Sequence, residues 1–357
     1  MKCSHPLFRL PLFPWERAPR DLKVRNGAVL LKSNKENYDF LQACLPSNLL
    51  ERLQEVPCGK CMSCRINLAE QWSSRCALEL KEHSSAYFVT LTYDDDHLRY
   101  AYRINPRHRT CTFEPTLVKR DAQLFIKRLR KYCDKLGFKL RYFGCGEYGS
   151  TTQRPHYHFI FFGLPFFSDS KLLNVRSNGN TTVKLYSSST LENLWSYGHV
   201  AIGDVTYQSI SYVARYTTKK FRSSYLSDED REFYDQALDE LTSSDLPVYE
   251  DDFLMMSRNP GIGKSYFDKH FSEIYRFDRL IYACPGSNVK VLKPLRYYDR
   301  LYDLADPDQF RKIKLKRSFK VKRISALEPS NTLSYFDKLS INEKKALDTS
   351  RKLIRTL

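Results

Sequence analysis

The chain has 357 residues, and its 58 Lys and Arg against 41 Asp and Glu give a formal charge of +17. A hydrophobic content of 42% excludes a disordered basic tail, and the 24 Tyr and 22 Phe favour a nucleic-acid partner, because phosphates attract cations and bases stack on rings. The most apolar run, Phe159–Phe167, is about half the length of a membrane span, and prolines interrupt the N-terminus where a signal peptide would be apolar, so we expect a cytoplasmic protein that does not bind membranes.

The first 57 residues are punctuated by prolines and are predicted to be irregular. They lead to Cys58, Cys61 and Cys64, whose spacing is typical of thiolate ligands on a tight loop, and Cys3 offers a fourth thiolate that would hold the N-terminus. Cysteines in a turn without metal, or an iron–sulfur cluster, are the alternatives. The pattern favours a structural zinc site, because nothing else near it indicates redox chemistry.

Helices and strands alternate through the middle of the chain. Apolar residues four apart predict a helix over 65–82, and Thr116 is the predicted N-cap of a helix that ends near Leu136. The stretch 168–189 is rich in Ser and Asn and is predicted to be an exposed insertion. Short helices are expected from 191 and over 207–221. Runs of β-branched and aromatic residues predict strands over 87–93, 139–148, 157–163 and 199–205.

The sequence PHYHFI places two histidines at the start of one of these strands. Residues two apart on a strand share a face, so His156 and His158 would present two imidazoles side by side while Tyr157 faces the other way. Imidazoles suit a divalent cation, and its charge calls for an acidic ligand nearby. Glu147 is the best candidate, since a hairpin would bring it to His156; Asp94–Asp96 are a second possibility, and two surface histidines without metal are the alternative.

A pair of tyrosines lies on the helix predicted after the last strand. Tyr212 and Tyr216 are four residues apart and share one helical face, and Arg215, Lys219 and Lys220 add positive charge beside them. Attack of a tyrosine hydroxyl on a DNA phosphodiester would give a phosphotyrosine and release a 3′-hydroxyl, and the linkage would retain the energy needed to rejoin the strand. The alternative is a pair of tyrosines in the core or stacked on cations.

Charge is unevenly distributed in the last third of the chain. Residues 228–252 hold eleven acidic residues and one Arg, whereas Arg311–Arg323 holds eight basic residues and no acidic one. The basic run is either a solvated face or flexible tail, or a DNA-contacting strand or arm. Residues 332–357 show a polar helical pattern. Gly263–Ser265 lacks the first Gly of a phosphate-binding loop, because residue 258 is Arg, so it predicts a structural turn and no ATPase.

Three blocks in this order resemble the motifs of the HUH endonucleases that start rolling-circle replication. They are FVTLTY at 88–93, PHYHFI at 155–160 and YVARY at 212–216, followed by Lys219. The two-tyrosine form resembles the replication initiators of microviruses. CGKCMSC at 58–64 and SRNPGIG at 257–263 are similar to the gokushovirus type, and the resemblance covers about residues 1–270.

The resemblance implies a function and a set of site residues. His156 and His158 would be metal ligands for Mg²⁺ or Mn²⁺, and Tyr212 and Tyr216 would be alternating nucleophiles. The protein would nick the viral strand at the origin of the double-stranded replicative form, let a host polymerase and helicase extend and unwind it, and rejoin the displaced strand as a single-stranded circle. Arg215 stands where relatives are expected to have Lys, so charge is kept while geometry differs.

The fold expected from these patterns is α+β, with a central antiparallel sheet flanked by helices as in HUH endonucleases. It would carry an N-terminal Cys-rich module and a basic C-terminal extension. The predicted segments are 1–83 for the Cys-rich region and its helix, 84–226 for the endonuclease core, and 227–357 for the acidic, Pro-Gly and basic regions. Two other functions fit the same patterns: a non-catalytic basic nucleic-acid-binding protein, or a plasmid initiator, relaxase or transposase of the same superfamily.

Overall fold

The structure is a computed structural model whose contacts divide the chain into two compact units. The first unit combines residues 1–69 with 302–357, and the second is residues 70–301. The three segments predicted from motifs stay a prediction. None of the helices within the described ranges is long and apolar enough to span a membrane. The structure describes residues 2–12, 24–25, 28–149, 151–178, 181–216, 227–327 and 334–354.

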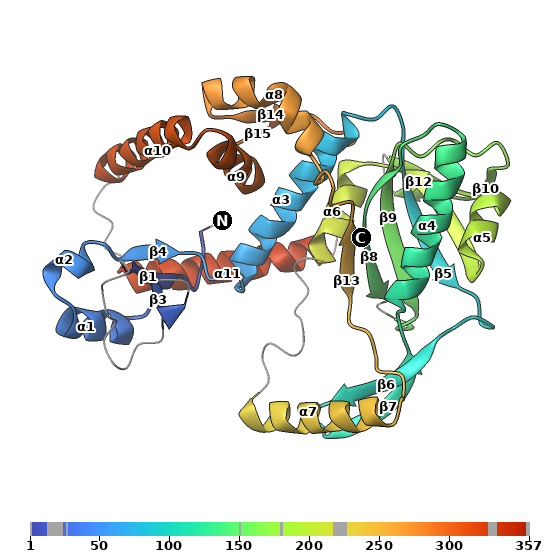
Figure 1. Ribbon diagram of the computed structural model, residues 1–357, viewed down its shortest axis with the longest axis horizontal. Helices are drawn as coiled ribbons and strands as arrows, with labels where there is room; N and C mark the ends of the chain where they lie inside the picture. Colours follow the sequence, from blue (N-terminus) through green and yellow to red (C-terminus); the bar gives the residue numbers. More distant parts are fainter. Residues whose placement is uncertain are drawn as a thin grey trace. The chain divides into compact units, whose positions relative to one another are not determined.

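An antiparallel sheet of seven strands forms the centre of the second unit (Figure 1). Its order is β10-β11-β12-β5-β9-β8-β13. The prediction of an α+β protein with a large antiparallel sheet is confirmed, because all four predicted strands lie in it, as β5, β8, β9 and β12. The bounds are β5 Ala86–Tyr93, β8 Arg141–Tyr148, β9 Pro155–Phe162, β10 Lys171–Asn178, β11 Thr181–Ser187, β12 Gly198–Asp204 and β13 Phe253–Met256.

Helices cover both faces of this sheet (Figure 1). On one face α4 (Lys119–Lys135) and α5 (Ser189–Trp195) pack on the sheet core, where Tyr157, Phe159 and Phe161 of β9 are fully buried. Tyr157 therefore faces away from its neighbours His156 and His158, as predicted. The other face holds α6 (Tyr207–Arg215) and the second half of α3 (Met62–Leu80), whose Trp72 stacks on Phe143 of β8.

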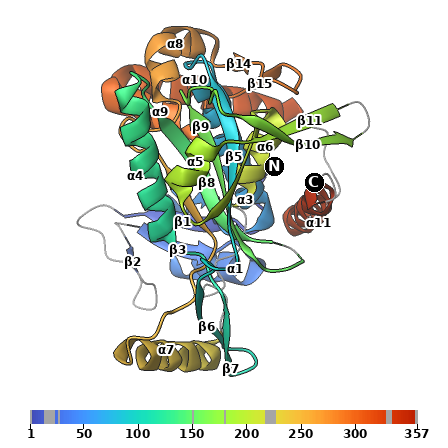
Figure 2. The ribbon, with the colours of Figure 1, turned by 90° about the vertical axis from the view of Figure 1, so that its right-hand side faces the viewer.

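Two expectations about the second unit are wrong. Residues 168–189 are not an irregular insertion, because β10 and β11 form an antiparallel hairpin that extends the sheet edge (Figure 2). Exposed Leu172 and Val175 leave the composition polar on average, which hides the strand pattern. Thr116 does not cap α4: the cap is Val118 without a side-chain bond, and the Thr116 hydroxyl instead donates to the carbonyl of Leu117.

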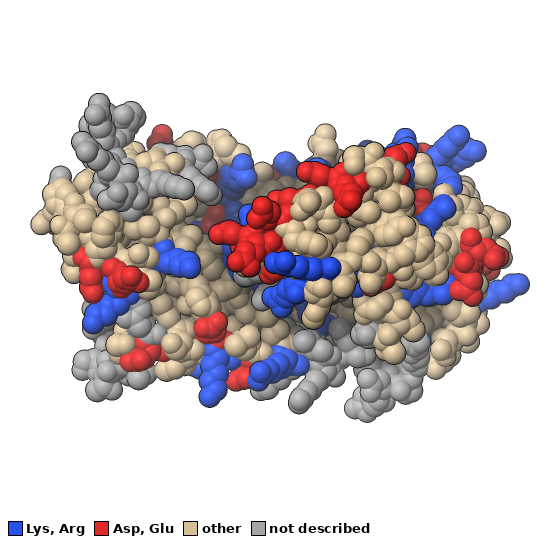
Figure 3. All heavy atoms as spheres, turned by 90° about the horizontal axis from the view of Figure 1, so that it is seen from below, with Lys and Arg blue, Asp and Glu red and all other residues tan. Residues whose placement is uncertain are grey.

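The acidic segment forms a helix, α7 (Asp228–Ser243), in the second unit. Figure 3 shows Asp and Glu side chains gathered over this helix on the face seen from below. Its charge would repel phosphates, so this face is a poor surface for DNA. The remaining elements are β6 Tyr100–Asn105, β7 Thr110–Pro115, α8 Lys264–Phe277, β14 Leu280–Tyr282, β15 Lys290–Leu292 and α9 Arg296–Ala305.

The predicted turn at Gly263 is confirmed. Gly263 has a φ of 77° and precedes α8, and its N–H donates to the carboxylate of Glu79 at 2.6 Å. Glu79 is fully buried and also binds the side chain of Arg141. The anion at the start of α8 is therefore the protein's own carboxylate.

The first unit contains a small sheet in the order β2-β3-β1-β4, so the prediction that residues 1–57 are irregular is wrong. A core of Leu10, Val29, Leu41 and Leu45 joins the sheet to α1. The strands are short and pair across long stretches of chain, so no local pattern announces them. The C-terminal helix predicted over 332–357 is observed as α11. The bounds are β1 Leu7–Pro11, β2 Val24–Arg25, β3 Ala28–Lys32, α1 Lys35–Cys44, α2 Ser47–Leu50, β4 Gln54–Val56, α10 Pro307–Leu327 and α11 Tyr335–Ile354.

Candidate active site and candidate metal centre

Strand register brings the predicted acidic and histidine side chains together. In the pairing of β8 with β9, Glu147 lies directly opposite His156, as the predicted hairpin requires. His158 is two residues further along β9 and points to the same face. Glu147 and His158 are buried, with 4% and 9% of their surfaces exposed, and His156 is half-buried. The three side chains thus share one partly dry face of the sheet.

Hydrogen bonds connect two of these three residues directly. His158 Nε2 lies 2.8 Å from Glu147 Oε1, and His158 Nδ1 lies 3.0 Å from the hydroxyl of Thr90 on β5. The other carboxylate oxygen, Glu147 Oε2, is buried and has no hydrogen-bond partner among the described residues. A buried carboxylate oxygen without a donor is costly, so this atom marks a place for a cation or a further donor.

His156 is oriented by the backbone. Its Nδ1 lies 2.6 Å from the carbonyl oxygen of Arg154, and because a carbonyl only accepts, Nδ1 must carry the proton. The lone pair is then on Nε2, the arrangement of a ligating histidine. Burial lowers the pKa of His156, with a contribution from neighbouring His158, which keeps the ring neutral and able to ligate.

The tyrosine pair lies on α6, which packs on β8 and β9. A capping box formed by Thr206 and Ser209 starts the helix, and Ile210, Val213 and Ala214 are buried against the sheet. The Tyr212 hydroxyl donates to Glu147 Oε1 at 2.5 Å, and the Tyr216 hydroxyl donates to Tyr212 at 3.0 Å. The helix therefore points both hydroxyls toward the acidic end of the site.

The local electrostatics disfavour ionisation of Tyr212. Burial and the adjacent Glu147 carboxylate raise the pKa of Tyr212 well above its usual value. Arg215 is in the last turn of α6, where its Nε donates to the carbonyl of Ser211, and burial lowers its pKa. Lys219 and Lys220 lie outside the described residues. A phenolate at Tyr212 would need positive charge to offset the neighbouring carboxylate.

Two contributors to the site were not singled out from the sequence. Thr90 binds His158 from the central strand β5, and Arg154 supplies the carbonyl that orients His156. The side chain of Arg154 also donates to Asp95, while Asp94 binds His97, so two residues of the second acidic candidate have partners of their own. Thr90 could have been found, since it stands two residues before Thr92 in a strand with one polar face.

The donor set at this face fits a divalent cation. It offers the lone pair of His156 Nε2, the buried and unpartnered Glu147 Oε2, and His158, whose Thr90 bond lets Nδ1 carry the proton and Nε2 ligate. Two imidazoles and one carboxylate suit Mn²⁺, whereas Mg²⁺ prefers oxygen ligands and would keep more waters.

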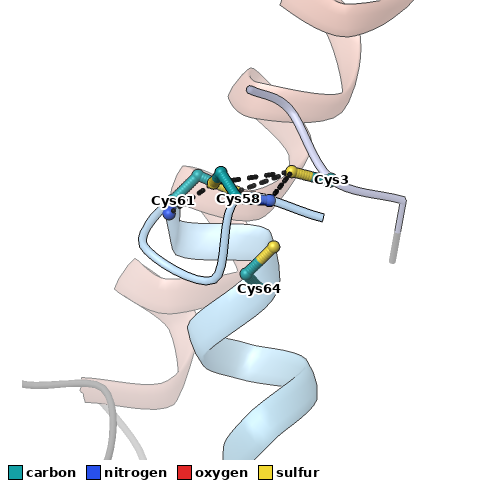
Figure 4. A group of neighbouring side chains, drawn as sticks. All are labelled: Cys3, Cys58, Cys61 and Cys64. Carbon is teal, nitrogen blue, oxygen red and sulfur yellow. Dashed lines mark hydrogen bonds between the residues drawn. The ribbon is translucent and has the colours of Figure 1, made fainter. Parts of the chain in front are cut away.

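A second group of metal-ligating side chains lies in the first unit. Cys3, Cys58, Cys61 and Cys64 have sulfur atoms that all lie within 4.8 Å of one another, and Figure 4 shows them converging from the N-terminal segment and the loop before α3. Cys3 is 3.6 Å from both Cys58 and Cys61. A tetrahedral ion about 2.3 Å from each sulfur would set them about 3.8 Å apart. The cluster can therefore hold a metal ion such as zinc.

The backbone around this cluster favours thiolates. The N–H groups of Lys60 and Cys61 both donate to the sulfur of Cys58, at 3.4 and 3.3 Å. Burial raises the pKa of Cys64 to about 11. Burial acts in the same direction on Cys61, but hydrogen bonds from Ser4 and from the backbone at Cys64 outweigh it and lower the pKa of Cys61 to about 5. Four thiolates this close repel one another, so full ionisation requires a cation.

Comparison with known proteins identifies relatives over almost the whole chain. The model of a family described as replication-associated protein ORF2 matches residues 86–221, the range from β5 to just beyond α6. Replication-associated protein ORF2 of Spiroplasma virus 4 is 32% identical over 346 residues, which cover 95% of this chain and 97% of that protein.

Two further relatives come from other phages. Replication-associated protein VP4 of Bdellovibrio phage phiMH2K is 29% identical over 277 residues, covering 76% of this chain and 75% of that protein. Replication-associated protein ORF4 of Chlamydia phage 1 is 32% identical over 167 residues, covering 46% of this chain and 38% of that protein. No solved structure matches the chain.

Proposed function

The chain belongs to the family of phage replication-associated proteins that includes ORF2 of Spiroplasma virus 4, and from this premise we propose that it is a metal-dependent DNA nickase that initiates rolling-circle replication. It cuts the viral strand at the origin of the double-stranded replicative form, stays attached to the 5′ end through a phosphotyrosine, and rejoins the displaced strand as a single-stranded circle.

One observation carries this proposal. Two tyrosine hydroxyls, a carboxylate and two imidazoles meet on one face of the sheet, and Glu147 joins Tyr212 to His158 through a single oxygen atom. A purely structural tyrosine pair would not need to meet a buried carboxylate that retains an unpartnered oxygen among the described residues. The arrangement puts a nucleophile beside a cation site, which is what phosphoryl transfer requires.

The chemical step transfers the phosphate from deoxyribose to tyrosine. The Tyr212 oxygen forms a bond to phosphorus, the bond from phosphorus to the 3′ oxygen breaks, and the proton lost by tyrosine balances the one gained by the 3′-hydroxyl. No hydrolysis occurs, so the phosphotyrosine can later be attacked by a 3′-hydroxyl to restore the phosphodiester. Tyr216, 3.0 Å away from Tyr212 between hydroxyl oxygens, supplies the second nucleophile for the regenerated origin.

His156, His158 and Glu147 would hold the catalytic cation, Mg²⁺ or Mn²⁺. When bound, the ion polarises the scissile phosphate and offsets the negative charge that accumulates on its oxygens. The chain's own residues do the rest: Thr90 and the Arg154 carbonyl orient the imidazoles, and α6 holds the tyrosines over the same face.

Positive charge after the tyrosines would hold the DNA backbone. Arg215 is partly buried at the end of α6, and Lys219 and Lys220 follow it in the sequence. Guanidinium and ammonium groups there would neutralise phosphates on either side of the cut. We assign these three residues to DNA binding as part of the same proposal.

The cysteine cluster would hold zinc in a structural role. Its four sulfur ligands leave no open position for a substrate, which is the pattern of a closed structural site. Zinc there would fasten the N-terminus to the loop before α3 and so stabilise the first unit.

The proposed partners follow from the proposed reaction. They are the origin DNA in both its double-stranded and its single-stranded form, a host helicase that unwinds the nicked duplex, and a host polymerase that extends the 3′-hydroxyl. The reaction would take place in the cytoplasm of the bacterial host.

A nicking assay tests the proposal. Supercoiled DNA that carries the viral origin is incubated with the full chain and Mn²⁺, and open circles with protein bound to the 5′ end are expected. The double variant Tyr212→Phe, Tyr216→Phe should form none, while Tyr207→Phe on the same helix should act normally. A 5′ adduct that persists in the double variant would exclude these tyrosines as nucleophiles.

A further inference from the structure

The helix α10 in the first unit is exposed along almost its whole length (Figure 1). Its start is anchored, because Phe310 is buried against Tyr302, with ring centroids 5.8 Å apart, and Asp306 accepts the N–H of Gln309. Beyond Phe310 even its apolar side chains face solvent, with Leu315 and Phe319 exposed by 51% and 68%. Packing within the first unit therefore does not account for the second half of this helix.

The exposed part of α10 carries a single sign of charge. Residues 309–327 contain no Asp or Glu, and eight of the residues from 311 to 323 are Lys or Arg. Lys314 pairs with Asp303 at 2.9 Å and lies over the ring of Phe310. This run of basic residues is therefore a helix, not the strand or flexible tail that the sequence left open.

Four of the basic residues form a continuous stripe. Lys312, Lys316, Lys320 and Arg323 are spaced four, four and three residues apart, so they lie within about 80° on one side of the helix and span about 16 Å. All four are exposed, and none makes an ion pair with another described residue. Like charges four residues apart destabilise a helix, so this stripe calls for an external anion of matching length.

We propose that this stripe of α10, Lys312, Lys316, Lys320 and Arg323, binds the phosphate backbone of double-stranded DNA without sequence preference. Duplex DNA presents one negative charge per about 1.7 Å of axis, so a stripe of about 16 Å faces a continuous row of phosphates. The stripe would keep the protein on the replicative form while the active site engages the origin. The proposal extends the DNA-processing function but does not depend on nicking.

The distribution of apolar residues argues against a lipid surface. A helix that lies on a membrane needs one continuous apolar face. Val321 is 55% exposed but stands about 160° around the helix from Phe319, so the exposed apolar side chains of α10 do not share one face. Charge complementarity with a polyanion is the property that the stripe does possess.

The salt dependence of duplex binding tests the proposal. The full chain is titrated against a labelled duplex of about 30 base pairs without the origin sequence, and the affinity is followed by fluorescence anisotropy at several NaCl concentrations. Each phosphate contact contributes a slope of about 0.9 in a plot of log affinity against log salt. The variant Lys312→Gln, Lys316→Gln, Lys320→Gln, Arg323→Gln should lower the slope by about 3 and weaken binding at least tenfold at low salt.

A matched control removes the same charge from another helix of the first unit. Lys338, Lys344, Lys345 and Arg351 are exposed residues of α11, which also carries acidic side chains. Their replacement by Gln should change the slope by less than about 1. Arg substituted at the three stripe lysines should restore the wild-type slope, and circular dichroism confirms that each variant is folded.

The outcomes separate the alternatives. An equal loss of slope in both Gln variants would mean that only net charge matters, and an unchanged slope in the stripe variant would mean that α10 does not contact DNA; either result overturns the proposal. Binding to phosphatidylserine vesicles that depends on the stripe, with duplex binding unchanged, would assign α10 to lipid instead. Nicking of a short single-stranded origin oligonucleotide is measured in parallel, so failure of the proposed nickase function is seen separately.

Discussion

The Tyr212 hydroxyl and the Glu147 carboxylate share a hydrogen bond of 2.5 Å, and the same carboxylate oxygen binds His158 at 2.8 Å. Glu147 therefore faces a nucleophile on one side and a cation ligand on the other. Because its second oxygen is buried and unpartnered among the described residues, the carboxylate is the residue on which the proposed reaction depends most.

Replacing this carboxylate by an amide tests its place in the site. Glu147→Gln keeps the shape of the side chain but removes the negative charge that a cation would neutralise, so Mn²⁺ should bind at least tenfold more weakly. We expect nicking to fall by at least a hundredfold. Calorimetric titration with Mn²⁺ and a nicking time course measure the two effects. Asp95→Asn, a change at the exposed acidic group that pairs with Arg154, is the control and should leave Mn²⁺ affinity unchanged.

The cysteine cluster should retain one metal ion per chain. Cys64→Ala removes the buried sulfur of the four, and we expect the zinc content to fall from one per chain to none and the melting temperature to drop. Elemental analysis and thermal unfolding measure these changes. Cys44→Ala, at an exposed position on α1 in the same unit, should alter neither; a loss of zinc in this control would place the metal elsewhere.

The reactivity of Cys61 in the metal-free protein should depend on pH. Its pKa is lowered from 9.0 to about 5 despite burial, because Ser4 and the backbone at Cys64 donate to its sulfur. The thiolate is therefore present above about pH 5 in the folded protein and only above about pH 9 in the unfolded one. The stabilisation that it gives is complete above about pH 9 and is lost as the pH falls through about 5.

Alkylation of the chelator-treated protein checks this expectation. The rate at Cys61 should level off a little above pH 5 in the folded protein and should continue to rise to about pH 9 in urea. Bound zinc should block the reaction at both pH values. A folded protein in which Cys61 reacts with a midpoint near pH 9 would contradict the assigned hydrogen bonds.

A buried network on the opposite face of the sheet should matter for stability alone. Tyr93 donates to the buried carboxylate of Asp121 at 2.8 Å. Tyr93→Phe leaves that carboxylate without its donor, so we expect a loss of about 1–3 kcal/mol in the free energy of unfolding. Urea denaturation measures it. Tyr197→Phe, which alters a neighbouring ring, should cost less than Tyr93→Phe.

Part of the site could be predicted from local sequence patterns. The alternation of side chains along a strand was enough to put His156 and His158 on one face, and the hairpin between β8 and β9 was enough to put Glu147 opposite His156. Both inferences depend only on the period of two and on short connections. The hydrogen bond from Tyr212 to Glu147 required more, because it depends on how α6 packs on the sheet, and no local pattern specifies that packing.

The first unit shows the same limit more strongly. β1 pairs with β3 and with β4, so Leu7 lies opposite both Lys32 and Val56. These strands have five residues or fewer, and their stability comes from partners far along the chain. The cysteine spacing, in contrast, predicted a local cluster, and the structure brings Cys3 to Cys58 across a sequence separation of 55 residues.

The central claim is that Tyr212 and Tyr216 are the nucleophiles. Mass spectrometry of the peptide linked to DNA after reaction of the full chain with origin DNA and Mn²⁺ tests it most directly. The account predicts a phosphonucleotide on Tyr212 or Tyr216, its transfer to the remaining tyrosine when either one is replaced by Phe, and no adduct in the double variant. An adduct on any other residue, or one that survives the double replacement, would contradict it.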